Sequence, residues 1–489
     1  MLIRDAELDF GGRRGDVRVA EGRVAEIAPR LSRRAGETVV TAGGCALLPS
    51  LCDHHLHLKA TAAARASVDC ADAACPDATA LAERLQAADR VLPAGGWLRG
   101  NGFHEHVLAG SGAAPDRDWL DRVVPHRPAR LQHRSGRMWL LNTAALRAIG
   151  VDEDDGDTPL ERRGGRFTGR LYDADGWLGA RTGARRPDLG DLSRALWALG
   201  VTAVTDCSHD NDRDDVAAFG AAQRSGALLQ DVLVMGNADL DGAGVPADGD
   251  DGPELAIGAR KFHLHDAALP DLDELTAAMR AAHAAGRNVA AHCVSRVDLA
   301  FALAAWRAAG ARPGDRVEHA SVAPPEALAE IAALGLTVVS QPAMISERGA
   351  VYRREVDADD LPHLYRLRSF QVAGVPLALS SDAPYTDIDP WRAMAAAVTR
   401  RCADGEPLGP GEALSPERAY AAMAGRPSGP GRGDLRLRAG MRADLCLLDR
   451  DWAAARADLG CVRPRRAWRA GADNYHLNGV GHGAPACAP

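Results

Sequence analysis

The chain has 489 residues, more than one hydrophobic core usually serves, so we expect one large domain and one small one. Its net charge is −8 and its acidic and basic residues are interspersed, which argues against nucleic acid or a membrane as a partner and favours a small-molecule substrate. The sequence shows no signal-like or bilayer-length apolar run, and its ten cysteines form no CxxC pair, so we expect a cytoplasmic protein with reduced thiols.

Short apolar strands at the start of the chain predict a small β-sheet domain. They are residues 16–19, 23–27 and 38–40, separated by glycine-containing turns. Residues 440–449 return to strand-like character, so we expect them to rejoin the N-terminal sheet. The predicted domains are a small β-sandwich (1–48 and 428–470), a large domain (49–427) and a tail (471–489).

Alternating strands and helices after residue 196 predict an α/β fold, a (β/α)8 TIM barrel. Seven β-type runs follow the strand that precedes His55, and they are residues 200–206, 228–235, 257–265, 288–294, 316–319, 336–341 and 377–382. Segments of helical periodicity lie between several of them, and glycines end three of these segments, at Gly286, Gly310 and Gly335. Residues 60–195 interrupt this pattern after the first strand, so we interpret them as a long insertion.

The two histidines of the sequence His55-Leu56-His57 follow a short apolar run. Side chains two apart on a strand point to the same face, so His55 and His57 can bind one cation together. Neutral imidazole is a common ligand of Zn²⁺ and similar ions. A lone HxH is weak evidence by itself, since solvated histidine pairs are common.

Later strands end with further residues of the metal-ligand type. His292, His319 and Asp382 come at the ends of the fifth, sixth and eighth strand candidates. Period-two spacing also places Lys261, His263 and His265 on one face of the fourth, and lysine occurs only at positions 59 and 261. With the HxH segment, the ends that carry His292, His319 and Asp382 make four ligand-type ends around one barrel. Together they indicate a shared metal site.

The insertion contains candidates for a substrate pocket, because loops after barrel strands often carry specificity. We single out His104, Trp139 and Trp177, and add His263 and His265 from the fourth strand. His104 and His106 form a second HxH outside a clear barrel strand. Core packing for the tryptophans and a surface location for the histidines are the alternatives.

The chain resembles the amidohydrolase superfamily, closest to the amidohydrolase-3 branch that includes N-substituted formamide deformylases. The resemblance rests on LLPSLCDHHLHL, GVTAVTD, AHC at His292, RVEHAS at 316–321, LSSDAP and GMRADLCLLDRD, and it covers nearly the whole chain. Ser50 stands where the family usually has glycine. The fourth strand is richer in histidine than is usual, which leaves its ligand open.

The resemblance implies a two-metal site. His55, His57 and Asp382 would hold a buried ion, expected to be zinc, and His292 and His319 a more exposed one. Lys261, carboxylated by CO2, would bridge the two; arginine cannot take this role, because it does not lose its proton.

The implied reaction is hydrolysis of a non-peptide C–N bond, of the amide or N-formyl type, in a small molecule. A metal-activated hydroxide would attack, and Asp382 would carry the proton to the leaving nitrogen, with His319 as the second catalytic candidate.

Other interpretations stay open at this point. A mononuclear zinc deaminase would use His55, His57, His292 and Asp382, with His319 as an orienting residue. A noncatalytic scaffold would keep the barrel but typically lose the ligands. Cys207 is either a thiolate ligand or a small core residue, and we favour the core. Monomer and homodimer are both compatible with the sequence.

Overall fold

The structure is a computed structural model, and it describes all residues except 72–73, 94, 111, 113, 184–185, 243–254 and 474–489. The chain forms two compact units: Met1–Leu58 together with Leu189–Pro489, and Lys59–Asp188. Most of the predicted tail at 471–489 lies outside the described residues.

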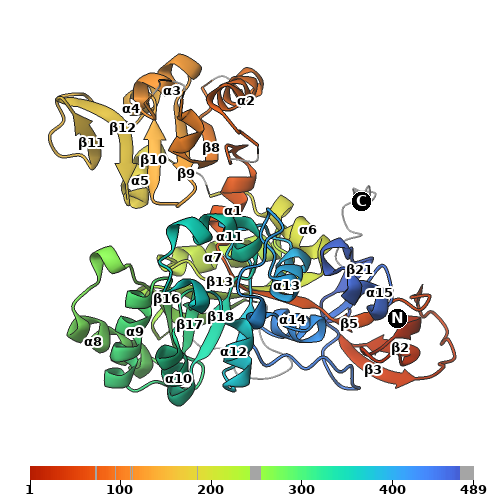
Figure 1. The fold of residues 1–489 in the computed structure, drawn as a ribbon. Helices are drawn as coiled ribbons and strands as arrows, with labels where there is room; N and C mark the ends of the chain where they lie inside the picture. The colour runs from red at the N-terminus through yellow and green to blue at the C-terminus, as the bar shows by residue number, and fades with distance from the viewer. Residues whose placement is uncertain are drawn as a thin grey trace. The chain divides into compact units, whose positions relative to one another are not determined.

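The first unit contains the predicted (β/α)8 barrel (Figure 1). Its eight neighbouring strands are β6 (Leu51–Leu56), β13 (Val201–Asp206), β14 (Asp231–Gly236), β15 (Leu255–His263), β16 (Val289–Cys293), β17 (Arg316–His319), β18 (Thr337–Ser340) and β19 (Leu377–Leu379). The barrel closes between its first and last strands, where Asp382 N donates to His55 O at 2.8 Å and His57 N to Ala383 O at 2.9 Å. This closure places the HxH segment beside Asp382.

The helices of this unit lie in the segments between the strands. Their bounds are α6 (Gly190–Ala198), α7 (Arg213–Arg224), α8 (Leu272–Ala284), α9 (Arg296–Ala309), α10 (Pro325–Leu334), α11 (Ala343–Glu355), α12 (Leu367–Val372), α13 (Pro390–Thr399) and α14 (Pro416–Met423). As predicted, glycine ends α10, where Gly335 adopts a left-handed φ of 67° that a residue without Cβ reaches at no steric cost. Most barrel strands are buried along their length, as expected of a parallel sheet covered by helices.

The N- and C-terminal segments build a small β structure with one shared core. One sheet has the order β3-β2-β1-β4 and the other β21-β20-β5. Their bounds are β1 (Leu2–Glu7), β2 (Arg14–Ala20), β3 (Arg23–Ala28), β4 (Val39–Thr41), β5 (Leu47–Pro49), β20 (Leu445–Leu447) and β21 (Arg466–Trp468), and α15 (Trp452–Ala457) lies between the last two. Ile3 and Val17 pack in the same cluster as Leu445 and Trp468, so the two ends of the chain stabilise each other.

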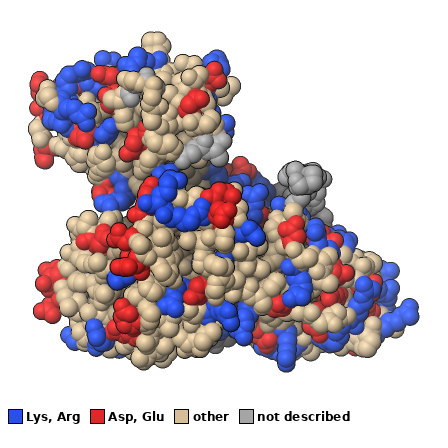
Figure 2. All heavy atoms as spheres, viewed as in Figure 1, with Lys and Arg blue, Asp and Glu red and all other residues tan. Residues whose placement is uncertain are grey.

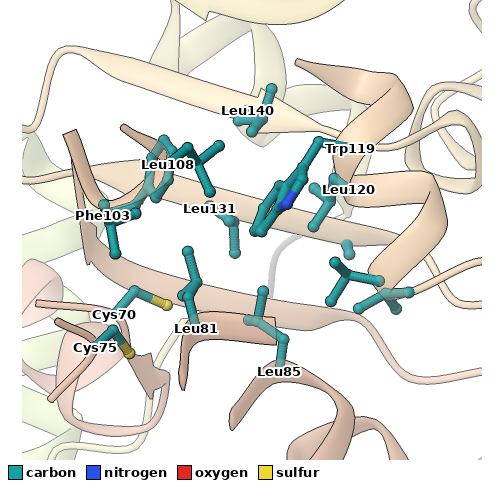
Figure 3. Packing of buried hydrophobic residues seen from close by; sticks show 14 of the residues in the cluster. Cys70, Cys75, Leu81, Leu85, Phe103, Leu108, Trp119, Leu120, Leu131 and Leu140 are labelled. Carbon is teal, nitrogen blue, oxygen red and sulfur yellow. The ribbon is translucent and has the colours of Figure 1, made fainter. Parts of the chain in front are cut away.

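The insertion folds as a unit with its own core. Its sheet has the order β11-β12-β10-β9-β8-β7. The strands are β7 (Val68–Asp69), β8 (Leu98–Phe103), β9 (Ala129–His133), β10 (Met138–Leu141), β11 (Leu160–Arg163) and β12 (Arg166–Tyr172), and the helices are α1 (Leu58–Arg65), α2 (Ala78–Val91), α3 (Arg117–Val123), α4 (Thr143–Ala148) and α5 (Asp175–Thr182). Leu81 and Leu85 of α2 and Trp119 of α3 pack against Phe103 and Leu131 of the sheet (Figure 3). The segment is therefore a compact α/β unit rather than a long loop.

Basic and acidic side chains are mixed on the face shown in Figure 2, as their interspersion in the sequence predicts. In the part of the chain that the structure describes, no helix combines the length and the apolar character needed to cross a bilayer.

Candidate metal centre

Two histidines and an aspartate meet at the carboxyl end of the barrel. His55 belongs to β6, His57 follows that strand directly, and Asp382 follows β19. The Nε2 atoms of His55 and His57 lie 3.3 Å and 3.4 Å from Asp382 Oδ1. Asp382 Oδ1 thus faces both imidazoles, and among the described residues His55, His319 and Asp382 have ligand atoms that all lie within 4.8 Å of one another.

His292 and His319 form a second group beside the first. Their ring centroids are 4.3 Å apart, and the His319 ring lies 4.8 Å from that of His55. His319 Nδ1 is also 3.9 Å from Asp382 Oδ2. The strand order explains why His292 and His319 are neighbours, because β16 and β17 are parallel neighbours that end at the same edge.

Lys261 is buried on β15, in register with Ala290 of β16. Its side chain is within electrostatic range of both groups. Burial lowers the pKa of His55 to about 3, and the Lys261 charge adds to this effect. Burial, His319 and Lys261 together hold the pKa of His292 well below its usual value. Lys261 therefore acts electrostatically on both histidine groups.

Several polar atoms of the centre fit a metal site because they are buried without a hydrogen bond. Among the described residues these include Lys261 Nζ and His319 Nε2. Leaving a buried polar atom unsatisfied costs about 1–3 kcal/mol, more for a charged one. Imidazole nitrogen and carboxylate oxygen are ligands that Zn²⁺ accepts, and a lysine amine can react with CO2 to give a carboxylate. The residues present therefore fit divalent ions with a carboxylated lysine.

The protonation states suit metal binding at neutral pH. Burial alone would raise the pKa of Asp382, but His319, the hydrogen bond from His57 and the nearby His55 outweigh it and lower the pKa to about 2. Burial lowers the pKa of His319 as well. An ionised carboxylate and neutral imidazoles are the forms that bind metal ions.

Three histidines of the centre, His55, His57 and His319, have their Nδ1 held by a neighbouring side chain. His55 Nδ1 donates to Glu318 Oε2 at 2.5 Å, and His319 Nδ1 donates to Gln341 Oε1 at 2.9 Å. His57 Nδ1 lies 3.1 Å from Ser208 Oγ. Fixing Nδ1 leaves Nε2 as the ligand atom and sets the orientation of the ring.

Glu318 is a buried residue of the centre that is absent from the residues predicted from the sequence. It is fully buried, and Arg316 donates to it and also to His54 O at 2.7 Å. Burial alone would raise the pKa of Glu318, but Arg316, Lys261 and His55 hold it well below its usual range. The i, i+2 spacing of Arg316 and Glu318, which puts both on one strand face, was the available signal.

The backbone is unusual at two of the site residues. His319 has a φ of 71° and Asp382 a φ of 57°, which is rare for residues with a Cβ and often marks functional sites. At His319 the turn breaks strand alternation, so that Glu318 and His319 both contact the centre. Next to Asp382, the Asp53 carboxylate accepts one hydrogen bond from the backbone N–H of Ser381 at 3.1 Å and another from the Ser381 hydroxyl at 2.5 Å.

The fourth strand is shorter than predicted. β15 ends at His263, so the prediction that residue 265 continues it is wrong; His265 Nδ1 instead accepts from Ala267 N and begins a short turn of 3-10 helix. Asp266 follows directly, and its Oδ1 lies 3.2 Å from His265 Nδ1. Such local side-chain contacts compete with continuation of the strand. His263 lies at the rim, with its ring 4.7 Å from His292. A substrate contact by either histidine stays a prediction.

The remaining substrate-pocket candidates belong to the insertion unit. Trp139 is 4% exposed, packs in a hydrophobic cluster and donates its indole N–H to Asp175 at 2.9 Å. Trp177 packs against the same cluster. These contacts are those of core residues, and a substrate role for Trp139, Trp177 and His104 stays a prediction.

Cys207 lies next to this centre as a buried thiol. Cys207, His55 and Glu318 each offer one ligand atom, and these three atoms lie within 4.8 Å of one another. Burial raises the pKa of the Cys207 thiol well above its usual value, so the metal-binding thiolate is disfavoured. Cys207 also packs with Met235 and Ala290, in agreement with the core interpretation.

The chain is similar in sequence and in fold to several known proteins. The N-substituted formamide deformylase of Arthrobacter pascens is 27% identical over 500 residues, which cover 89% of this chain and 90% of that protein. Among solved structures, an uncharacterized metal-dependent hydrolase from Pyrococcus horikoshii has a TM-score of 0.74 at 19% identity, covering 93% of this chain and 98% of that one. A 5-methylcytosine deaminase from Klebsiella pneumoniae has a TM-score of 0.52 at 14% identity, covering 99% of both chains.

These structural likenesses concern the fold. Residues 38–472 match the model of a protein family, the Amidohydrolase family. These residues span both the barrel and the insertion. With a match over most of its length, this chain belongs to the Amidohydrolase family.

Proposed function

We propose that this enzyme hydrolyses the C–N bond of an amide or N-formyl group in a small molecule, with two divalent ions bridged by a carboxylated Lys261. The observation that carries the proposal is the buried Lys261 amine, which makes no hydrogen bond and acts electrostatically on His55, His292 and His319. A bridge at this position would contact both histidine groups.

The proposed division of the ligands follows the family resemblance. His55, His57 and Asp382 would hold one ion, since both imidazoles face one carboxylate oxygen. His292 and His319 would hold the other, next to the rim residue His263. The donor set suits Zn²⁺. When bound, the ions polarise the substrate carbonyl and lower the pKa of water toward about 7.

Asp382 is the group placed to move the proton. Its carboxylate is ionised at neutral pH and lies within 4 Å of His55, His57 and His319. It would accept a proton from the attacking water and deliver it to the leaving nitrogen, acting first as a base and then as an acid. Gln341 would orient the His319 ring by accepting a hydrogen bond from its Nδ1 atom. His319 would be the second catalytic residue, at the same end of the site.

The similarity to the formamide deformylase supports amide or N-formyl chemistry. A mononuclear deaminase is the second candidate, because the ligand atoms of His55, His319 and Asp382 lie within 4.8 Å of one another, close enough for a single ion. His319 would then be a ligand and not the orienting residue expected from the sequence. A noncatalytic scaffold fits less well, since every strand end expected to carry a ligand-type side chain still has one.

The two enzymatic candidates differ in metal content and product. The experiment is to count the metal ions per chain by elemental analysis, and to assay formate, carboxylic acid and ammonia separately on a panel of N-formyl, N-acyl and aminoheterocyclic compounds. The proposal expects two ions in the barrel centre, counted as those whose removal by a chelator abolishes activity, and release of formate or a carboxylic acid. One such ion with release of ammonia would replace it by the deaminase.

A further inference from the structure

The insertion unit contains a second group of histidines, which the barrel chemistry does not use. His104 directly follows β8, and His133 is the last residue of β9. The two strands are parallel neighbours, with Phe103 opposite His133, and Arg134 N extends the pairing by donating to Phe103 O at 2.8 Å. Parallel strands end at the same edge, so both histidines are held side by side.

The side chains at this edge lie at ligand distances. One ligand atom each of His104, Glu105 and His133 lie within 4.8 Å of one another. His133 Nε2 is 3.1 Å from Glu105 Oε2, and the His104 and His133 rings are 5.0 Å apart. The His106 ring is a further 4.5 Å from that of His104. We call His104, Glu105, His106 and His133 the insertion cluster.

Rigid neighbours hold the insertion cluster in place. Val107 and Leu108, which follow Glu105 and His106 in one turn of 3-10 helix, are buried in the core of the unit (Figure 3). Ser135 lies 2.7 Å from His133 Nδ1, which leaves Nε2 facing Glu105. A donor set held in this way loses little conformational entropy on binding an ion.

We propose that His104, Glu105 and His133 bind a zinc-class divalent cation at the edge of the insertion sheet, with His106 or water as the fourth ligand. Two imidazoles and one carboxylate suit Zn²⁺ and related ions, whereas Mg²⁺ and Ca²⁺ prefer oxygen ligands throughout. Glu105 and His106 are exposed, so an ion can enter from solvent. All four residues belong to the insertion unit, so this site contains no ligand of the barrel centre.

The test is calorimetric titration of Zn²⁺ into enzyme whose barrel centre is already loaded. The wild type should bind one further ion per chain. The double variant His104→Ala with His133→Ala should lose this binding while its barrel metal content and far-ultraviolet circular dichroism stay unchanged. His126→Ala, an exposed histidine of the same unit, is the matched control and should bind as the wild type does.

A second variant guards against misfolding. Glu105→Gln alters one exposed side chain and should weaken the additional site by at least about tenfold, since even groups outside the ligand shell contribute 10–100-fold to metal affinity. The proposal is overturned if the loaded wild type binds no further Zn²⁺, or if either variant binds it with unchanged affinity.

Discussion

The barrel centre and the insertion cluster use the same kinds of side chain at different levels of burial. His55 is 1% exposed and His319 3%, whereas Glu105 and His106 are open to solvent. In the centre every donor needs a protein or metal partner, since an unsatisfied buried group is costly. At the surface, water can satisfy the same groups. Substitutions should therefore reduce enzymatic activity strongly in the centre and only slightly in the insertion cluster.

The largest effect is expected for Asp382→Asn. Asparagine keeps an oxygen ligand but cannot carry the proton, so turnover should fall by about 10²–10⁴ while much of the bound metal remains. Steady-state kinetics with metal analysis of the same sample checks this. A variant that keeps its ions and turns over at nearly the wild-type rate would show that Asp382 is not the proton carrier, and His319 would be tested next.

Glu318→Gln should act through the metal. The amide cannot accept the His55 N–H as strongly as the carboxylate, and it leaves Arg316 without its ionic partner. We expect metal affinity to fall by about 10–100-fold, with activity recovering at high Zn²⁺ concentration. Competition with a chelator measures the affinity. Activity that stays low at saturating metal would assign Glu318 a role other than orienting His55.

Buried histidines should also make the stability of the metal-free protein depend on pH. His54 faces away from the centre, and burial lowers its pKa to about 3. The unfolded chain binds this proton near pH 6.5 and the folded chain does not, so the stabilisation is complete above that pH and is lost as pH falls toward 3.

His54→Leu should therefore reduce the pH slope of the unfolding free energy by about 1.4 kcal/mol per pH unit, which corresponds to one proton. Urea unfolding between pH 4 and 6 measures the slope. His126→Leu, at an exposed position of the insertion, should leave it nearly unchanged. An equal slope in the wild type and in His54→Leu would show that His54 takes up its proton in the folded state.

The smallest effect on catalysis is expected for the double variant of the insertion cluster. His104→Ala with His133→Ala should keep kcat within about twofold of the wild type, since neither residue holds the barrel ions, and a substrate contact by His104 would show as a higher KM. Loss of one bound zinc ion with unchanged kcat would separate the two sites. A fall in kcat as large as that of Asp382→Asn would instead connect the insertion cluster to the reaction.

Much of the barrel could be predicted, because its strands are short apolar runs and its helices end at glycines such as Gly335. The strand at 316–319 has the predicted bounds. The order HxH, lysine, histidine, histidine and aspartate predicted which side chains lie together at the centre, because strand ends of a barrel meet at one edge.

Other features depend on tertiary contacts that periodicity does not contain. The role of Glu318 requires the positive φ of His319, which places adjacent residues on the same side. The insertion cluster requires β8 and β9 to pair in parallel, and neither the histidines nor their spacing predicts that pairing. The histidine run after Lys261 suggested a longer strand, but the local bonds of His265 end it at His263.

The central claim is the carboxylated Lys261, and the most direct measurement is ¹³C NMR of enzyme reconstituted with metal and ¹³C-labelled bicarbonate. The chain has two lysines, so the spectrum is simple and Lys59→Ala is the matched control. We predict one carbamate resonance that persists in Lys59→Ala and disappears in Lys261→Ala, together with one metal ion. Absence of this resonance in fully active wild-type enzyme, or its persistence in Lys261→Ala, would contradict the bridge.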